Sequence, residues 1–145
     1  MTFERPHGNY LISTDPTRLD LAVMHRWLSE RSYWAEGRTR ETVARSVEHS
    51  LNFGAYNAIG AMVGAARVVT DWSTFAWLCD VFVVEDHRGS GLGVALVEAA
   101  VTHPDLRDIK RFALATADAH DLYRRFGFTE LERPKRWMMR RGPTA

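Results

Sequence analysis

The segment Arg88-Gly89-Ser90-Gly91-Leu92-Gly93 most constrains the fold, because it stands between two segments of different periodicity. Residues 77–84 before it form an apolar run rich in β-branched and aromatic residues, which predicts a strand. After it, apolar residues recur at helical spacing, namely Leu92, Ala95, Leu96, Ala99 and Ala100. A strand that enters a helix through a glycine-rich turn presents unpaired backbone N–H groups, which bind phosphate. The sequence therefore predicts a site for a phosphorylated ligand at residues 88–93.

The spacing of these glycines separates the segment from two common phosphate-binding loops. A P-loop requires a Lys-Ser or Lys-Thr pair after its last glycine, and no lysine stands there. A dinucleotide-binding fingerprint requires glycine or alanine at its last position, where this chain has Val94. Here the glycines recur at every second position behind Arg88. The ligand must therefore be sought among other phosphate-bearing groups.

The rest of the chain alternates between strand-like and helix-like segments. We expect strands or helices, in chain order, at 9–13 (strand), from Leu19 to Leu28 (helix), 39–51 (helix, with Thr39 as N-cap), 53–58 and 61–70 (hairpin), 111–116 (strand), 119–126 (short helix), 128–131 and 136–140 (strands). This interleaving predicts an α+β (mixed α/β) fold around one sheet. The length suits a single domain, residues 1–145.

Composition argues against several classes of protein. A net charge of +1 gives no global attraction to nucleic acid or to a membrane surface. Basic residues do gather in the last third, so a nucleic-acid-associated domain is a rival interpretation, but no motif for it is present. The single cysteine fits a reducing, cytoplasmic protein, and no histidine pair has helical metal-ligand spacing. We therefore expect no metal, no nucleic-acid partner and no membrane partner.

Two segments together resemble the GNAT superfamily of acyl-CoA-dependent N-acyltransferases. Residues 81–93, Val-Phe-Val-Val-Glu-Asp-His-Arg-Gly-Ser-Gly-Leu-Gly, are similar to the family's strand, Arg/Gln-x-x-Gly-x-Gly/Ala turn and helix. Residues 122–128, Leu-Tyr-Arg-Arg-Phe-Gly-Phe, are similar to its closing Leu-Tyr-x-x-x-Gly-Phe element. The resemblance implies a mixed, mostly antiparallel twisted sheet, flanked by helices and splayed at an acetyl-CoA site. Where many members have proline before the turn, this chain has Glu85-Asp86.

The resemblance also assigns residues to the cosubstrate, acetyl-CoA. It implies that Arg88 belongs to the binding turn and that the pyrophosphate is held by the backbone N–H groups of Gly89, Ser90, Gly91, Leu92 and Gly93. It implies that Val81, Phe82 and Val83 pair with the pantetheine amides, as a peptide-like ligand would by β-augmentation. Because many relatives dimerise, a homodimer is allowed.

Tyr123 is the candidate general acid. It matches the family tyrosine that approaches the CoA sulfur, and a phenol donates a proton readily as a neutral group. The alternative is a core tyrosine packed beside Phe126 and Phe128.

Asp80 is the candidate general base. On a regular strand it would share a face with Leu78, Phe82 and Val84, where loss of water would raise the pKa of its carboxyl. The alternative is an ion pair with Arg67 on the neighbouring strand.

Aromatic residues are candidates for the acceptor side. Tyr33 and Trp34 fall in an expected loop between helices, and Trp77 opens the central strand. Cys79 has no evident histidine partner and is not expected to act as a nucleophile. The resemblance implies transfer of an acetyl group from acetyl-CoA to a primary amine of a small molecule or peptide, and the absence of an evident nucleophile favours a direct, sequential route. The alternative is a catalytically inactive acyl-CoA-binding regulatory module.

Overall fold

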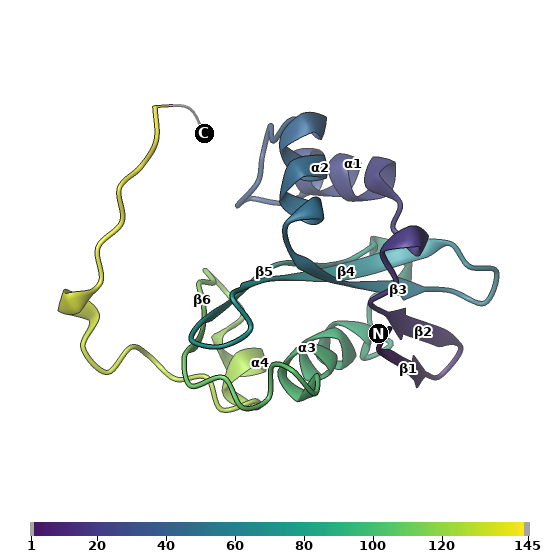
Figure 1. Cartoon of the computed structure of the whole chain (residues 1–145). Helices are drawn as coiled ribbons and strands as arrows, with labels where there is room; N and C mark the ends of the chain where they lie inside the picture. Colours follow the sequence, from purple (N-terminus) through teal and green to yellow (C-terminus); the bar gives the residue numbers. More distant parts are fainter. Residues whose placement is uncertain (1, 144–145) are drawn as a thin grey trace. The chain divides into compact units, whose positions relative to one another are not determined.

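The computed structural model describes residues 2–143, which fall into two compact units that divide after Ala115 (Figure 1). The first unit holds the sheet and most of the core. The second unit, from Thr116, contains one short helix, α4 (His120–Arg124), and a 3-10 turn, η3 (Pro134–Arg136). That residues 1–145 form a single domain stays a prediction.

The first unit is built on one six-stranded sheet whose strand order follows the chain. Its strands are β1 (Glu4–His7), β2 (Tyr10–Ser13), β3 (Leu51–Tyr56), β4 (Met62–Thr70), β5 (Ala76–Val83) and β6 (Phe112–Leu114). Neighbouring strands are antiparallel, except that β5 and β6 are parallel. The predicted α+β class and the mixed, mostly antiparallel sheet are confirmed.

Helices cover both faces of this sheet (Figure 1). On one face lie α1 (Leu21–Arg31) and α2 (Arg40–Glu48), and on the other lies α3 (Leu92–Thr102); short 3-10 turns occur at η1 (Pro16–Arg18) and η2 (Glu85–His87). The starts of the first two helices are capped: Asp20 accepts from two N–H groups of α1, and Thr39 accepts from the Thr42 N–H, as its position predicts.

The core beneath α1 and α2 depends on aromatic packing against the sheet. Trp27 of α1 stacks on Phe82 of β5, with ring centroids 4.6 Å apart and an interplanar angle of 12°. Around this pair lie buried apolar side chains, namely Met24, Leu28, Val43, Tyr56, Met62 and Ala65. The helix α3 buries the face that its spacing predicts, with Leu92, Leu96 and Ala99 all fully enclosed. The core therefore fixes β5 from both sides.

At the ends of the chain, one expectation is confirmed and another is wrong. The strand expected at 9–13 forms as β2, and sequence reasoning missed β1, which pairs with it after a turn at Gly8, φ +57°. The sequence of β1, Glu-Arg-Pro-His, carries little strand signal. At the other end, strands do not form at 128–131 and 136–140. Residues 129–143 are all exposed, so no burial favours an extended, paired conformation there.

The close packing of β4 on β5 gives a stability prediction. A Cβ at Gly64 would lie 2.9 Å from the Phe82 carbonyl oxygen, which belongs to backbone and cannot move alone. We expect Gly64→Ala to lower the free energy of unfolding by about 1–3 kcal/mol in urea titrations. The control is Gly93→Ala, whose Cβ would meet its nearest neighbour, Val83 Cγ2, at 3.8 Å and should leave stability equal or higher. Equal stability of Gly64→Ala and wild type would contradict this packing.

Candidate functional site: an open strand edge and a glycine turn

One edge of β5 becomes open halfway along the strand. β5 pairs with β4 over most of its length, but with β6 only through Ala76–Leu78. Beyond Leu78, no strand within residues 2–143 pairs with that edge. Val81, Phe82 and Val83 lie on the open stretch. The predicted parting of the two parallel strands is therefore present, and it leaves backbone groups of β5 without a strand partner, as a site for a hydrogen-bonding ligand requires.

Arg88 lies at this open edge. The Val84 N–H donates to Val63 of β4, at 2.8 Å. The Val83 carbonyl and the Val84 N–H belong to the same trans peptide group and point in opposite directions. The Val83 carbonyl therefore faces away from β4. Arg88 Nε donates to that carbonyl at 3.1 Å, and its guanidinium carbon lies 6.0 Å from the centroid of the Trp27 ring. A positive charge thus stands beside the open edge, directly before the glycine turn.

The glycine turn leads into α3 with free N–H groups. Gly89 has φ +83° and Gly91, the N-cap of α3, has φ +78°, a conformation that favours glycine. The first intrahelical hydrogen bond runs from the Ala95 N–H to the Gly91 carbonyl, at 3.0 Å. The N–H groups of Leu92, Gly93 and Val94 precede it and have no intrahelical acceptor. No side chain caps Gly91 in the described chain, so these donors remain available to an anion.

The N-terminal hairpin holds this turn in place, a feature that sequence reasoning missed. The His7 ring Nε2 lies 2.9 Å from the Ser90 carbonyl oxygen, and since a carbonyl only accepts, Nε2 is the donor. On the other side of the turn, the Tyr10 hydroxyl lies 2.9 Å from His87 Nδ1. These contacts join residues about eighty positions apart in the sequence, so no local sequence pattern predicts them. They restrict the turn without using its free N–H groups.

Asp80 lies in a β-bulge, which changes the face it points to. Arg67 pairs with Cys79 and Ala65 pairs with Phe82, so Asp80 is an extra residue in β5, at φ +51°. Directly opposed residues project from the same face of a sheet, so Arg67 and Cys79 share one. The Asp80 side chain reaches Arg67 on that face. The expectation that it shares a face with Leu78 by simple alternation is therefore wrong, and the bulge is the reason.

The Asp80 carboxylate is buried, with its side chain 3% exposed, and three side chains donate to it. Arg38 Nη1 and Arg67 Nε both donate to Oδ2, at 2.7 and 2.9 Å. The Trp34 indole N–H donates to Oδ1 at 2.9 Å. The ion pair with Arg67, one of the two sequence interpretations, is thus formed. Arg38 and Trp34 come from the loop between α1 and α2 and were not anticipated.

These partners decide the charge state of Asp80. Burial by itself raises the pKa of the carboxyl, but the charges and hydrogen bonds of Arg67 and Arg38 outweigh burial and hold the pKa below its usual value. The expectation of a raised pKa is wrong. A carboxylate that stays ionised and already accepts from three donors is a poor proton acceptor near neutral pH. Its geometry suits a structural role, and we call Asp80 with its partners Arg38, Arg67 and Trp34 the Asp80 anchor.

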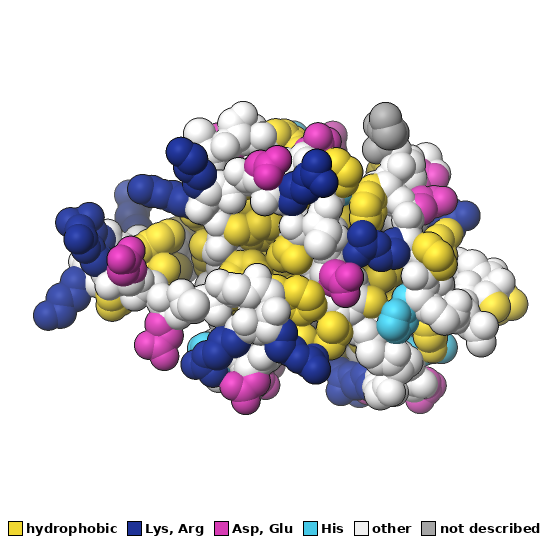
Figure 2. All heavy atoms as spheres, turned by 90° about the horizontal axis from the view of Figure 1, so that it is seen from below, with side chains coloured by type: hydrophobic (Ala, Val, Ile, Leu, Met, Phe, Trp, Pro, Cys, Tyr) yellow, Lys and Arg dark blue, Asp and Glu magenta, His cyan; other side chains and the backbone are white. Residues whose placement is uncertain are grey.

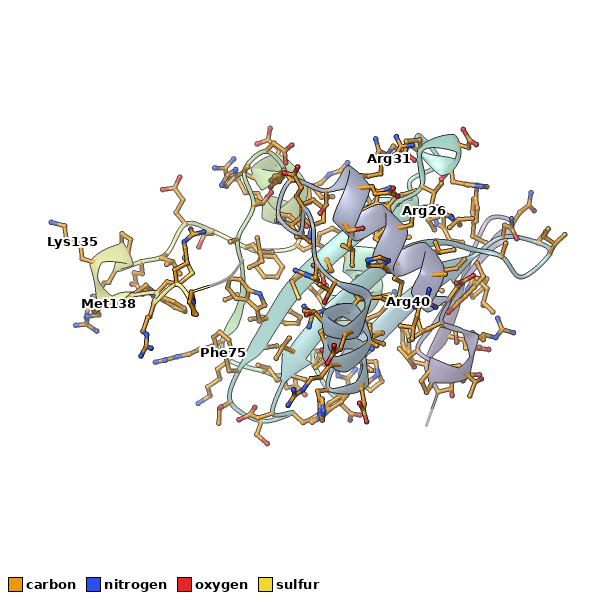
Figure 3. All side chains as sticks on the ribbon, turned by 90° about the horizontal axis from the view of Figure 1, so that it is seen from above. Arg26, Arg31, Arg40, Phe75, Lys135 and Met138 are labelled. Atoms are coloured by element: carbon orange, nitrogen blue, oxygen red, sulfur yellow. The ribbon has the colours of Figure 1, made fainter. Side chains whose placement is uncertain are left out.

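The candidate acceptor residues lie on the same side as this anchor. Trp34, 43% exposed, is held by Asp80, and Tyr33 packs edge-on against it with ring centroids 5.1 Å apart. Trp77 pairs with Val69, two residues from Arg67, so it projects from the Arg67 face. Viewed from above, α1 and α2 lie over the strands (Figure 3). That these aromatic residues bind substrate stays a prediction.

Cys79 is not poised for nucleophilic attack. Burial raises the pKa of its thiol to about 11, despite the nearby Arg67 charge. Since the thiolate is the reactive form, the thiol is inert near neutral pH. This agrees with the expectation from sequence.

Tyr123 belongs to the second unit. It lies on α4, half-buried, with its ring 6.0 Å from that of Phe128 in an edge-on contact. The Phe128 N–H donates to the Tyr123 carbonyl, which closes the turn at Gly127. The contact with Phe128 is the one expected of a packed tyrosine. The role of Tyr123 as an acid stays a prediction.

Over residues 2–143, no group of three or more His, Cys, Asp or Glu side chains is arranged to hold a metal ion. None of the described helices has the length and apolarity needed to cross a bilayer. On the face seen from below, acidic and basic side chains are interspersed around exposed hydrophobic ones (Figure 2).

The buried anchor gives a prediction on stability and its pH dependence. Asp80→Asn leaves Arg38 and Arg67 without their counter-charge, so we expect the free energy of unfolding to fall by about 3 kcal/mol near pH 7. Because the folded pKa is lowered, the carboxylate's contribution is present above the unfolded pKa of about 3.9 and is lost as pH falls through the folded value. The difference between wild type and variant should therefore shrink on acidification.

Urea titrations at several pH values measure this difference. Asp108→Asn is the control, because its carboxylate is 92% exposed and its removal should change little at any pH. Equal stability of Asp80→Asn and wild type at neutral pH would contradict a stabilising role for the ion pairs of Asp80.

Known proteins share this arrangement. The family model "Acetyltransferase (GNAT) family" matches residues 21–128. A crystal structure of a candidate GNAT acetyltransferase from Xanthomonas campestris pv. campestris is 46% identical, covers 95% of both chains and superposes with a TM-score of 0.89. A candidate acetyltransferase from Gibberella zeae is 31% identical over an alignment of 138 residues that covers 80% of this chain and 76% of the relative.

A Mycobacterium tuberculosis protein solved in complex with CoA shares the fold at 23% identity, with a TM-score of 0.65 over 78% of this chain and 68% of its own. Since the family model spans the helices, the open strand edge and the glycine turn, the chain belongs to the acetyltransferase (GNAT) family.

Proposed function

We propose that this protein transfers an acetyl group from acetyl-CoA to a primary amine of a small molecule or a peptide, directly and through a ternary complex. The observation that carries the proposal is the continuity of the open β5 edge with the glycine turn and the start of α3. Amide pairing groups and an anion site follow one another along the chain, as a ligand with peptide-like amides and a diphosphate requires.

The residues of the turn fit a diphosphate. The N–H groups of Leu92, Gly93 and Val94 are unpaired within the helix, and a helix start carries partial positive charge. A Cβ at Gly89 would meet no atom within 4 Å, so the turn leaves room on that side. Arg88 adds a full positive charge beside the turn. Glu85 is turned to Arg31 of α1, with 3.7 Å between their charged atoms, which favours a diphosphate by directing that carboxylate elsewhere.

The open edge supports the rest of the cosubstrate. We infer that the stretch Val81–Val83 pairs with the amides of a pantetheine arm; within it the Val83 carbonyl faces the open edge, and the backbone groups of Phe82 face β4. Acetyl-CoA, when bound, supplies an activated acetyl thioester. The protein's part is then to align the acceptor amine, to stabilise the oxyanion with a main-chain N–H near Val81, and to protonate the leaving thiolate.

We assign proton donation to Tyr123 and no proton abstraction to Asp80. The amine attacks in its neutral form, the C–S bond breaks as the C–N bond forms, and the proton that the nitrogen loses passes to the phenolate that Tyr123 becomes on donating to the thiolate. Tyr123 matches the family's closing tyrosine, and a neutral phenol is a suitable donor to a thiolate. Asp80 is ionised and committed to Arg38, Arg67 and Trp34. Its proposed role is to fix the loop between α1 and α2 on the acceptor side.

The diphosphate site is tested by Gly91→Glu. The variant forces a side chain into a backbone at φ +78° and places a negative charge at the start of α3. We expect affinity for acetyl-CoA, measured by calorimetry, to fall at least about tenfold, a loss of about 1.4 kcal/mol. The control is Gly60→Glu in the turn between β3 and β4, with φ +85° and no atom within 4 Å of an added Cβ. Equal binding by both variants would contradict the assignment.

The proton donor is tested by Tyr123→Phe. Loss of the hydroxyl should lower the turnover number by about 100-fold and leave acetyl-CoA binding intact, because general acids contribute on that scale. Release of free thiol from acetyl-CoA with a panel of amines reports the turnover. Tyr56→Phe is the control, since the Tyr56 hydroxyl is buried away from any acceptor in the described residues. Unchanged turnover in Tyr123→Phe would reject the acid role.

A further inference from the structure

The Asp80 anchor carries more positive than negative charge. Two guanidinium groups, of Arg38 and Arg67, converge on a single carboxylate oxygen. The side chains of these arginines are only 22% and 12% exposed, so water screens them weakly. One carboxylate therefore faces two cations in a poorly solvated place. The arrangement leaves an excess positive charge that burial makes costly.

Among the described residues, Asp80 is the carboxylate that forms an ion pair with Arg38 and with Arg67, and neither arginine has a second one. The other partner of Arg67 is the hydroxyl of Ser50, a neutral acceptor at 3.0 Å. The hydrogen bonds to the Asp80 carboxylate are thus formed, but its single negative charge neutralises only one of the two arginines.

Most of the polar groups left over at the anchor are donors; the buried acceptor among the described residues is Asn52 Oδ1, on the residue opposite Arg67 in β3. Each guanidinium has five N–H bonds, and among residues 2–143 Arg38 uses Nη1 while Arg67 uses Nε and Nη1. The ring of Trp27 lies 5.8 Å from that of Trp34, and its buried indole N–H has no acceptor within the same residues. A ligand that offers acceptor oxygens and negative charge would satisfy this surplus.

The position of the anchor connects it with the proposed reaction. Asp80 directly precedes Val81, the first residue of the stretch to which we assign the pantetheine arm. Its partner Trp34 is partly exposed beside it. An acceptor held at the arginines would therefore lie close to the strand that carries the cosubstrate, on the side to which sequence assigned the acceptor.

We propose that the acceptor carries, besides its amine, an anionic group, a carboxylate or a phosphate, which binds Arg38 and Arg67. This inference rests on the proposed acetyltransferase function and adds the class of its substrate. The same excess charge disfavours acceptors that remain purely cationic, because like charges in a weakly screened place repel. The anionic group also holds the amine in one orientation, which raises its effective concentration at the thioester.

The test compares four small primary amines as acceptors: propylamine, β-alanine, aminoethyl phosphate and diaminopropane. They differ in charge at the far end and little in the length of the chain that bears the amine. We expect kcat/KM, from thiol release, to be at least about tenfold higher for one of the anionic amines than for propylamine, and lowest for diaminopropane. Comparison of kcat/KM for β-alanine with that for aminoethyl phosphate shows whether a carboxylate or a phosphate is preferred.

Variants assign the preference to the anchor. Arg38→Gln should reduce the ratio of anionic to neutral kcat/KM by at least about tenfold, and Arg38→Lys should retain part of it. The matched control is Arg40→Gln, which removes an exposed charge of α2 two residues away and should leave the ratio unchanged. Acetyl-CoA binding, measured by calorimetry on each variant, shows that the fold and the cosubstrate site are intact.

The outcomes separate the inference from the function on which it rests. Equal kcat/KM for neutral and anionic amines, or a preference that survives Arg38→Gln, would overturn the inference and leave the acetyltransferase proposal standing. Binding of acetyl-CoA without thiol release for any amine would overturn both.

Discussion

The fold of the first unit depends on a carboxylate that one extra residue turns towards two arginines. At a regular position in β5, Asp80 would alternate with its neighbours; in the bulge its side chain reaches Arg67 of β4 and Arg38 of the loop between α1 and α2. A positive φ at a non-glycine residue costs on the order of 1 kcal/mol, although Asp tolerates it better than most. Two ion pairs and the Trp34 hydrogen bond offset that cost.

This arrangement lets one strand serve several purposes. Along one edge, β5 is held by β4; along the other it is paired only at its start, which leaves Val81–Val83 open. One face packs under α1 through the stack of Phe82 on Trp27. The end of the strand continues into the glycine turn, which His7 and Tyr10 of the N-terminal hairpin hold from outside. A rigid strand with one free edge is what a site for an extended ligand needs.

Local signals in the sequence predict the local parts of this site, and contacts distant in sequence account for the rest. The glycine turn and α3 are predictable because spacing, turn chemistry and periodicity all lie within residues 88–100. The ion pair of Asp80 with Arg67 can also be predicted from sequence, because the strands that carry the two residues follow one another along the chain. Arg38, however, lies 42 residues from Asp80 in the sequence. The alternation of apolar and polar residues in a strand also does not show where a one-residue bulge reverses the faces. The pKa of Asp80 was therefore misjudged, because burial was inferred without its second cation.

Whether Asp80 is an ionised anchor or a proton acceptor is tested most directly by NMR titration of its own carboxyl carbon. Comparison with Asp80→Asn assigns the resonance. We expect a pKa below the usual value of about 3.9 and no titration of this group near neutral pH. A midpoint close to neutrality would show a carboxyl able to accept a proton there, and would contradict the anchor and the acceptor class inferred from it.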